Sequence, residues 1–410
     1  MTDFDTAVPP RGSLGGDALA LAVGMAVANA GNYGFNLVMA FLLGPEAYGA
    51  LAALLALVLV GSVPGLALQA VVARRTALAG GPVWPGARWL TGRAGFGLAL
   101  LTVAAGPGLV LFLHLDSAVP ALWLALALAP TPLLFAVQGL LQGRERFAAL
   151  AAVMVAGAGV KLAIGLTLVA AGFGVSGAMA GVAAGGILAA LAGLRLTREP
   201  GAGLPRAPGW WPEVGGATTG LLGLFLLANL DVLLARHFLD RSAAGRYALG
   251  AVVAKIAFWA PQFVVTVVFP RLVGGADTRR LVGGSALAIG GFGGLLAAAL
   301  AVAALTGLAV PVLGGGYAGL GPLLPLFAAL GTGLALVQLL LFEGIATRDR
   351  RMGRAVAVAL VAEVALVAGP LHGSVAQVAG AALAVVTALA AAGWWLLRQR
   401  LRRPSLPAVA

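Results

Sequence analysis

The sequence of 410 residues has no cysteine, only three histidines and little charge of either sign. Without cysteine the chain can form neither a disulfide nor a thiolate metal site. The histidines show no spacing with carboxylates that suits a metal, so we predict no metal and no other cofactor. Charged residues make up 10% of the chain, against about a quarter in soluble domains, which leaves too little polar surface to cover a soluble globule.

Apolar residues are abundant instead. They make up 61% of the chain, and they fall in runs of about 20, the length that crosses the hydrocarbon core of a bilayer. A helix satisfies its own backbone hydrogen bonds in lipid. We therefore predict an all-α polytopic membrane protein with about twelve transmembrane helices. The expected spans are residues 18–43, 49–73, 94–114, 120–142, 148–171, 177–196, 217–237, 246–270, 282–305, 319–346, 355–369 and 375–397.

The arginines are distributed unevenly between the two sets of loops. Twenty-one lie in the tails and loops of one face, and only Arg236, Arg241 and Arg246 lie on the opposite face. Because Lys and Arg accumulate in cytoplasmic loops, we predict a multi-pass protein of the inner or plasma membrane with both termini in the cytoplasm. This topology also accounts for the net charge of +12, so no nucleic-acid partner is predicted.

The longest loop divides the chain into two halves with six predicted spans each. An even number of spans gives both halves the same orientation in the membrane, which predicts a parallel repeat. The predicted regions are a cytoplasmic N-tail at 1–17, a first six-helix lobe at 18–196, a cytoplasmic linker at 197–216, a second six-helix lobe at 217–397 and a basic cytoplasmic C-tail at 398–410.

Three markers support the duplication, because they recur at nearly equal spacings in the two halves. They are Gly49, Pro64 and Arg74 in the first half and Gly245, Pro261 and Arg271 in the second. Each proline is expected to kink the second span of its half. Chance recurrence is the alternative, since glycine and proline are common in this chain.

Four segments carry a resemblance to a known family. They are Leu43-Gly44-Pro45-Glu46-Ala47-Tyr48-Gly49, Asn229-Leu230-Asp231-Val232-Leu233-Leu234-Ala235 with Ala244-Gly245-Arg246-Tyr247-Ala248, Val268-Phe269-Pro270-Arg271, and Gly314-Gly315-Gly316-Tyr317. In this order they resemble the polysaccharide (O-antigen type) flippases of the multidrug/oligosaccharidyl-lipid/polysaccharide transporter superfamily. The resemblance implies two six-helix lobes around a central cavity that opens alternately to each side. It also implies polyprenyl-diphosphate-linked oligosaccharides as substrates.

We therefore expect a transporter, not an enzyme, that flips a polyprenyl-diphosphate-linked oligosaccharide from the cytoplasmic to the outer leaflet for polysaccharide biosynthesis or export. The alternatives are a multidrug/cation antiporter of the same superfamily and a peptidoglycan-precursor flippase. A membrane-embedded glycosyltransferase or polymerase is disfavoured, because no long loop carries paired carboxylates. Besides the lipid bilayer, candidate partners are H+ or Na+ as coupling ions and a polysaccharide polymerase or glycosyltransferases.

Four ionisable side chains stand out within the predicted spans, where a charge is costly and needs a partner or a watery cavity. Lys161 and Lys255 are the only lysines of the chain, and we predict that they hold the substrate diphosphate in the central cavity. Asp231 and Glu363 are the predicted charge-pairing or ion-coupling residues, with Asp231 holding Lys255 when the site is empty. A purely structural ion pair between Asp231 and Lys255 is the alternative.

Asparagines form a polar face on the first span. Asn29, Asn32 and Asn36 follow one another at spacings of three and four residues, so they share one side of a helix. Amides hydrogen-bond sugar hydroxyls, and these three residues together with Gln262 are predicted to contact the sugars of the substrate. Packing between polar helix faces would explain the same pattern equally well.

A second polar face is predicted on the eighth span, where Lys255, Trp259, Gln262 and Thr266 are spaced by four, three and four residues. A cation, an aromatic ring and two hydrogen-bonding groups on one face suit a sugar diphosphate. A polar seam between two helices is again the alternative.

Two further polar residues are expected to lie outside the site. Asn229 is two residues from Asp231, so on a continuous helix the two side chains would point away from each other. Glu343 lies near the cytoplasmic end of its span, where a solvated carboxylate is expected rather than a buried one.

The predicted topology can be tested with single cysteines, because the native chain has none. Arg198→Cys and Asp116→Cys would be probed separately with a membrane-impermeant thiol reagent in intact cells. We expect labelling at position 116, on the outer face, and none at position 198 in the cytoplasmic linker. Labelling at position 198 but not at position 116 would overturn the topology.

Overall fold

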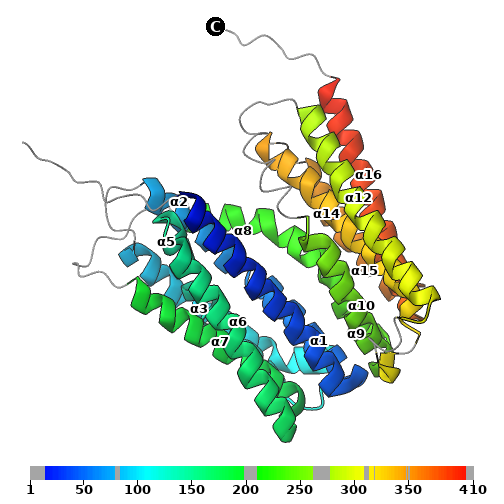
Figure 1. Ribbon diagram of the computed structural model, residues 1–410, viewed down its shortest axis with the longest axis horizontal. Coiled ribbons are helices and arrows are strands. Elements are labelled where there is room, and N and C mark those ends of the chain that lie inside the picture. Colours follow the sequence, from blue (N-terminus) through cyan, green and yellow to red (C-terminus); the bar gives the residue numbers. More distant parts are fainter. Residues whose placement is uncertain are drawn as a thin grey trace, which may run out of the picture. The chain divides into compact units, whose positions relative to one another are not determined.

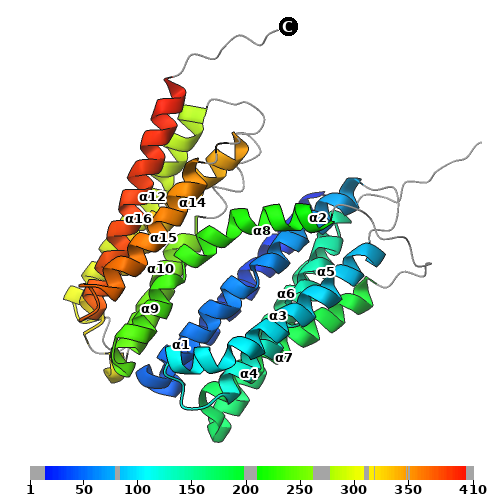
Figure 2. The same cartoon turned by 180° about the vertical axis from the view of Figure 1, so that it is seen from behind.

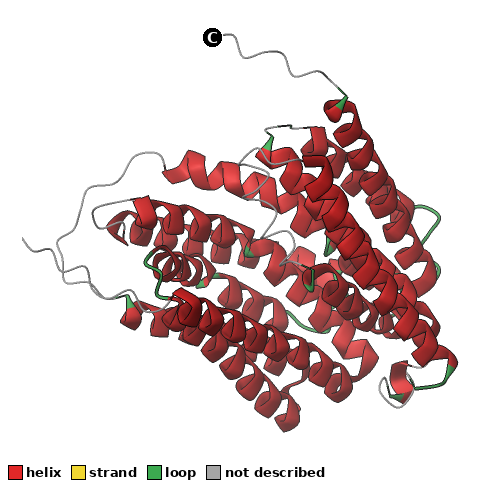
Figure 3. Ribbon diagram, turned by 45° about the horizontal axis from the view of Figure 1, so that its top comes forward, coloured by secondary structure: helices red, strands yellow, loops and turns green. Residues whose placement is uncertain are grey.

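The described part of the chain is helical. The computed structural model describes residues 14–78, 84–197, 210–261, 278–308, 314–317, 319–347, 349 and 351–402. Helices joined by turns make up these residues, and no strand occurs among them (Figure 3). The predicted all-α fold class is confirmed. Each of the twelve predicted spans overlaps a described helix or a pair of consecutive helices.

Many of these helices are long and apolar enough to cross a membrane. Within the described residues, seven continuous helical stretches meet this requirement, and the bent pair Pro212–Leu227 and Leu230–Phe238 makes up to eight. Two of the seven, Leu19–Leu78 and Phe147–Leu196, contain 60 and 50 residues. At 1.5 Å per residue, each is long enough for two crossings of a core about 30 Å thick.

The helices belong to two compact units. Unit 1 comprises Met1–Phe35, Gly61–Gly106 and Val119–Thr218, and unit 2 comprises Asn36–Val60, Pro107–Ala118 and Thr219–Ala410. Each unit holds the larger part of one predicted lobe. Two segments of the first predicted lobe, 36–60 and 107–118, group with unit 2. The internal duplication itself stays a prediction.

Unit 1 contains the first part of α1 (Leu14–Gly61), α2 (Val63–Leu78), most of α3 (Trp84–Phe112), α4 (Val119–Leu128), α5 (Thr131–Gly143), α6 (Phe147–Leu168), the π-helical turn η1 (Val169–Phe173), α7 (Gly174–Leu196) and the beginning of α8 (Trp210–Leu227) (Figure 2). The helices α6 and α7 form a hairpin that turns at Gly172, whose φ of 89° suits glycine. Glycine also allows their close contact, because a Cβ on Gly181 would lie 2.5 Å from the backbone nitrogen of Gly165.

Unit 2 contains the second part of α1, the end of α8, α9 (Leu230–Phe238), α10 (Arg241–Trp259), α12 (Thr278–Leu305), the short 3-10 turns η2 (Gly315–Tyr317) and η3 (Gly321–Leu323), α14 (Leu324–Ala346), α15 (Arg351–Ala368) and α16 (Val375–Leu401) (Figure 1). Helix α14 packs against α10, α12 and α16. On its α10 side, a Cβ on Gly331 would overlap the carbonyl oxygen of Ala254. The missing side chain therefore sets the distance between these two helices.

Both marker prolines lie next to the end of a helix. Helix α1 ends at Gly61, and α2 begins at Val63 with Pro64 as its second residue. Helix α10 ends at Trp259, two residues before Pro261. A proline lacks the N–H needed to continue a helix from the preceding turn, which accounts for both interruptions. The marker Arg271, like the segment Val268–Arg271, lies outside the described residues.

Three of the four segments that carry the family resemblance meet within unit 2. Helix α1 is sharply kinked at Gly44, which has a φ of 70°, a conformation that glycine adopts without strain. The kink presents Pro45 to α10, where a Cβ on Gly245 would overlap the carbonyl oxygen of Pro45. Gly316, in the third segment, is also close, since its Cβ would lie 3.1 Å from Pro45 Cδ.

Hydrogen bonds to backbone oxygens hold this junction together. Tyr317, which is 2% exposed, donates its hydroxyl to the carbonyl of Ala40 at 2.8 Å. Arg236, at the end of α9, donates to the carbonyls of Glu46 at 3.3 Å and Leu113 at 2.8 Å. The contacts with Ala40 and Glu46 lie on either side of the kink in α1, and the contact with Leu113 joins α9 to the end of α3. These segments therefore have a structural role in unit 2.

The junction should be sensitive to one added methyl group. Gly245→Ala places a Cβ against the Pro45 carbonyl, and we expect overpacking to lower the free energy of unfolding by about 1–3 kcal/mol. The measurement is the midpoint of thermal unfolding of the purified protein in detergent. Gly380→Ala in α16 is the matched control, because nothing lies within 4 Å of the added Cβ. Equal melting of Gly245→Ala and the wild type would contradict this packing.

Candidate functional site

Lys161 lies within a predicted span of unit 1, and we describe it with two of its contacts as the Lys161 cluster (Asn32, Phe35 and Lys161). The ammonium group of Lys161 donates a hydrogen bond to Oδ1 of Asn32. It also lies 4.7 Å from the centre of the Phe35 ring, within the range of a cation–π interaction. Among the described residues, Lys161 has no carboxylate partner. The ammonium group is thus held by neutral groups.

Glycines on α6 and α7 position this cluster. Phe35 is fully buried, and its ring fills the space beside Gly165, where a Cβ would lie 2.8 Å from ring atom Cε2. Gly165 is one helical turn after Lys161. On α7, a Cβ on Gly185 would lie 2.9 Å from the Cβ of Lys161. Small residues therefore let α1 and α7 approach α6 at the level of the lysine.

The three asparagines of the predicted polar face differ in their surroundings. Asn32 contacts Lys161, as described above, and both Asn29 and Asn32 are exposed. Asn36 belongs to unit 2, where its Oδ1 accepts a hydrogen bond of 3.4 Å from the hydroxyl of Tyr48. Of the predicted sugar contacts, Asn32 is therefore the one that the structure brings into contact with Lys161, a predicted phosphate contact.

Unit 2 contains a second group of intramembrane charges, which we call the carboxylate cluster (Asp231, Tyr247, Lys255 and Glu363). Asp231, on α9, is 5% exposed. The hydroxyl of Tyr247 on α10 donates to its Oδ2 at 2.8 Å, whereas its Oδ1 has no hydrogen-bond partner among the described residues. Lys255, two turns further along α10, interacts with Asp231 electrostatically.

Glu363 is the most deeply buried carboxylate of this cluster. It lies on α15 and is 1% exposed, and neither of its oxygens has a hydrogen-bond partner among the described residues. Its electrostatic neighbours include Asp231 and Tyr247. Two negative charges at such a site would repel each other, and burial makes each one costly. The cluster can lower this cost by binding a proton or a small cation.

A small cavity lies beside Asp231 and Lys255, two of the four residues of the cluster. Its polar lining residues are Asn229, Asp231 and Lys255, with Trp259 at one side. The cavity volume is about 20 Å³, room for about one water molecule. A sugar diphosphate does not fit in this space, but a proton or a water molecule does.

Asn229 corrects the expectation that it points away from Asp231. The residue is the N-cap of α9 with a φ of −137°, so the chain is not a continuous helix between the two side chains. Its side-chain nitrogen donates to the carbonyl of Phe225 at 2.8 Å. The break between α8 and α9 thereby brings both Asn229 and Asp231 to the cavity wall.

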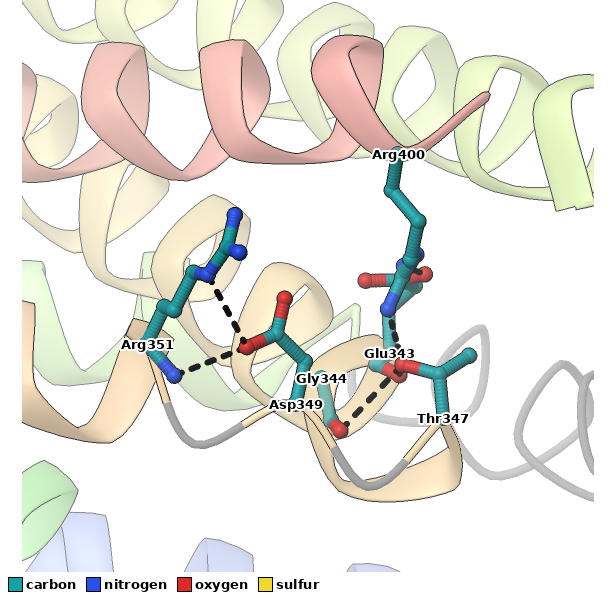
Figure 4. Close-up of polar contacts among 6 residues, drawn as sticks. All are labelled: Glu343, Gly344, Thr347, Asp349, Arg351 and Arg400. Carbon is teal, nitrogen blue, oxygen red and sulfur yellow. Dashed lines mark hydrogen bonds and ion pairs between the residues drawn. The ribbon is translucent and has the colours of Figure 1, made fainter. Parts of the chain in front are cut away.

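Glu343 corrects the expectation of a solvated carboxylate. It is 3% exposed and forms an ion pair with Arg400 at the end of α16. Figure 4 shows Arg400 reaching from α16 to Glu343 and to the hydroxyl of Thr347. The same view shows Asp349, which accepts a 2.9 Å hydrogen bond from the backbone nitrogen of Arg351.

Two residues of the predicted polar face on the eighth span lie outside the described residues, and one contact of the carboxylate cluster is not predicted by the sequence. Gln262 and Thr266 lie outside the described residues. The contact between Tyr247 and Asp231 is not predicted by the sequence, in which Tyr247 stands out only as part of a family motif. Its spacing of 16 residues from Asp231 spans two helices and a turn, so no helical periodicity links the two. Among the described residues, no group of three or more histidines and carboxylates lies close enough to hold a metal.

Comparisons with known proteins identify the fold. No family model and no curated protein sequence matches the chain. An inward-facing multidrug resistance MATE family transporter of the MOP superfamily matches with a TM-score of 0.67 and 14% identity, over 95% of this chain and 100% of the other. The lipid II flippase MurJ in an inward closed conformation matches with a TM-score of 0.73 and 12% identity, over 93% and 87%. The Vibrio cholerae MATE transporter VcmN matches with a TM-score of 0.62 and 17% identity, over 95% and 97%.

Such low identities establish similarity of fold and nothing finer. The chain has the fold of the polytopic MATE and MurJ-type transporters. This confirms the predicted class of multi-pass, all-α membrane protein with a transporter fold.

Proposed function

We propose that the protein flips a polyprenyl-diphosphate-linked oligosaccharide between membrane leaflets by alternating access. The observation that carries this proposal is the Lys161 cluster. A lysine within a predicted span has no carboxylate partner among the described residues, although charge within a membrane is costly. An anionic ligand would offset that cost. A diphosphate offers several acceptor oxygens to a compact ammonium group.

The neighbouring residues fit a ligand that continues into sugars. Asn29 and Asn32 are exposed and share one face of α1, and Asn32 contacts Lys161. An amide can exchange its bond to the ammonium for bonds to hydroxyls. We propose that Asn36, Gln262 and Lys255 complete the substrate contacts in the conformation that holds the ligand.

The carboxylate cluster is proposed to couple transport to a cation. Asp231 and Glu363 have oxygens without a hydrogen-bond partner among the described residues, and Asp231 lines a cavity too small for the substrate. Binding of H+ or Na+ would relieve their repulsion, while release would restore it. A change of charge inside packed helices can favour one of two arrangements of the unit. Lys255 would compete with the cation for Asp231.

A multidrug/cation antiporter remains the second candidate, because MATE transporters share this fold. The carboxylate cluster favours that function, since its negative charges suit a cationic substrate. The positive charge at Lys161 disfavours it. The fold of MurJ likewise keeps a peptidoglycan-precursor flippase as a candidate, and its lipid-linked diphosphate would use the same contacts.

We further propose an inner or plasma membrane location with both termini in the cytoplasm, from the arginine distribution. Substrate would then enter from the cytoplasmic leaflet, where lipid-linked precursors are assembled. Glycosyltransferases and a polysaccharide polymerase would be the proteins that supply substrate and consume product.

Lys161→Met should abolish most flipping, because it keeps an apolar stem of similar length and removes the charge. We expect the initial rate of flipping in reconstituted vesicles to fall about tenfold or more. This factor corresponds to the free energy of one hydrogen bond to a charged group. Lys161→Arg should retain part of the activity. The substrate is a fluorescent polyprenyl-diphosphate oligosaccharide, and a cationic dye and a peptidoglycan precursor are tested in parallel.

The control is Arg195→Gln, which removes one positive charge from an exposed position at the end of α7. It should flip at the wild-type rate, and thermal unfolding should verify that all variants are folded. If Lys161→Met is folded and flips the substrate at the wild-type rate, Lys161 does not hold the substrate diphosphate. Transport of the dye but not of the lipid-linked oligosaccharide would favour the antiporter.

A further inference from the structure

The hairpin of α6 and α7 ends in a turn that carries no polar side chain. This turn consists of η1 and Gly174, and we call residues 169–174 the hairpin tip. The stretch between Lys161 and Arg195 contains no charged residue, and its polar residues are Thr167 and Ser176. Such a composition is typical of a membrane span and not of a turn in water.

The other turns on the same predicted face have a different composition. Four of them are described in full by the structure, and each contains at least one charged residue or histidine. These residues are Glu46 within α1, His114 and Asp116 after α3, Asp240 and Arg241 between α9 and α10, and His372 after α15. Among these turns, the hairpin tip is therefore the exception.

The side chains of the hairpin tip are not covered by other described parts of the chain. Ala170, Ala171 and Phe173 are exposed, and Phe173 is 62% exposed. A Cβ on Gly172 or Gly174 would have nothing within 4 Å. One aromatic ring and two methyl groups thus form an apolar surface at the end of the hairpin.

The length of the hairpin places this surface at one boundary of the bilayer. Figure 1 shows α6 and α7 side by side, and Arg146 precedes the first helix while Arg195 lies in the last turn of the second. From Arg146 to Leu168 the chain advances 22 residues, or about 33 Å. The hydrocarbon core is about 30 Å thick. With both arginines among the headgroups of one leaflet, the hairpin tip reaches the far edge of the core.

The backbone of the hairpin tip also suits lipid. Irregular turns that face lipid do not occur within the hydrocarbon region, because their backbone groups would lack hydrogen bonds. Here η1 is π-helical, a conformation in which backbone groups hydrogen-bond along the helix. Gly172, with a φ of 89°, and Gly174, with a φ of 53°, then reverse the chain. The hydroxyl of Thr167 is satisfied as well, since it donates to the carbonyl of Ala163 at 2.9 Å.

We propose that the hairpin tip inserts among the lipids of the leaflet opposite Arg146 and Arg195, which is the outer leaflet in the predicted topology. Phe173 and the two alanines would contact acyl chains close to the headgroups, while the arginines hold the other end of the hairpin among headgroups. Anchors at both boundaries would fix the depth of α6 and α7 in the bilayer. Because it requires only membrane insertion, this proposal is independent of the transported substrate.

The hairpin tip fits other surroundings less well. Water would leave the Phe173 ring solvated, and burial of an aromatic ring in an apolar medium is favourable. A second copy of the chain would need a larger contact, because a stable interface buries about 800 Å² on each partner, more than a six-residue turn can offer.

Fluorescence quenching in nanodiscs, which expose both faces of the bilayer to solvent, would test the proposal. The chain has no native cysteine, so Ala171→Cys and Phe173→Cys are each labelled with an environment-sensitive fluorophore. Ser117→Cys, at an exposed position of the turn after α3, is the matched control. Leu166→Cys is the control for depth, because it is exposed on α6 and lies about 8 Å below position 171.

We expect iodide to quench labels at positions 171 and 173 several-fold more weakly than the label at position 117. A phospholipid with a nitroxide near the top of its acyl chain should quench positions 171 and 173 most strongly, and a deeper nitroxide should quench position 166 most strongly. Thermal unfolding verifies that each variant is folded. Iodide quenching at position 171 as strong as at position 117 would place the hairpin tip in water and overturn the proposal. Labels at 171 and 173 that neither iodide nor the nitroxide lipids quench would also overturn it, because the tip would then be covered by protein.

Discussion

The hydrocarbon core of a bilayer supplies no hydrogen-bond partners, so each polar group within it must be satisfied by the protein or by a hydrated cavity. Several hydroxyl groups in these helices meet this requirement locally, by donating to the carbonyl four residues earlier. Examples are Thr102 to Leu98, Thr167 to Ala163 and Thr332 to Ala328. The helices can then pack through glycine and alanine without leaving polar atoms exposed to lipid. Lys161, Asp231 and Glu363 have no such local partner, and we propose that they have a role beyond packing.

The two units differ in the charge of these side chains and in the contacts that hold them. In unit 1, Lys161 is positive and is held by an amide and an aromatic ring. In unit 2, Asp231 and Glu363 are acidic, and three of their four oxygens lack hydrogen-bond partners among the described residues. A cation without a carboxylate suits an anionic ligand, and carboxylates without donors suit a proton or a metal cation. We propose that the phosphate contact of Lys161 belongs to unit 1 and that the coupling carboxylates belong to unit 2.

Much of the fold could be predicted from hydrophobic runs, since their length and order determine where spanning helices lie. Local conformation was harder to predict. Asn229 and Asp231 were assumed to be on one helix, but a break between α8 and α9 turns both to one cavity. The position of Glu343 near a helix end predicts a solvated carboxylate. Its ion pair with Arg400 is a contact between residues far apart in the chain, which the sequence of one helix does not indicate. Periodicity describes one helix at a time, so it reveals neither a broken helix nor a distant partner.

The coupling role of the carboxylate cluster is the claim on which the proposed mechanism rests. Its most direct test is the initial rate of flipping by purified protein in vesicles, with and without an imposed proton or sodium gradient. Glu363→Gln is compared with Glu343→Gln, because both remove the charge of a buried glutamate and only Glu363 belongs to the cluster. We expect one of the gradients to accelerate the wild type and Glu343→Gln and to leave Glu363→Gln unchanged. A Glu363→Gln variant that responds to the gradient as strongly as the wild type would contradict the mechanism.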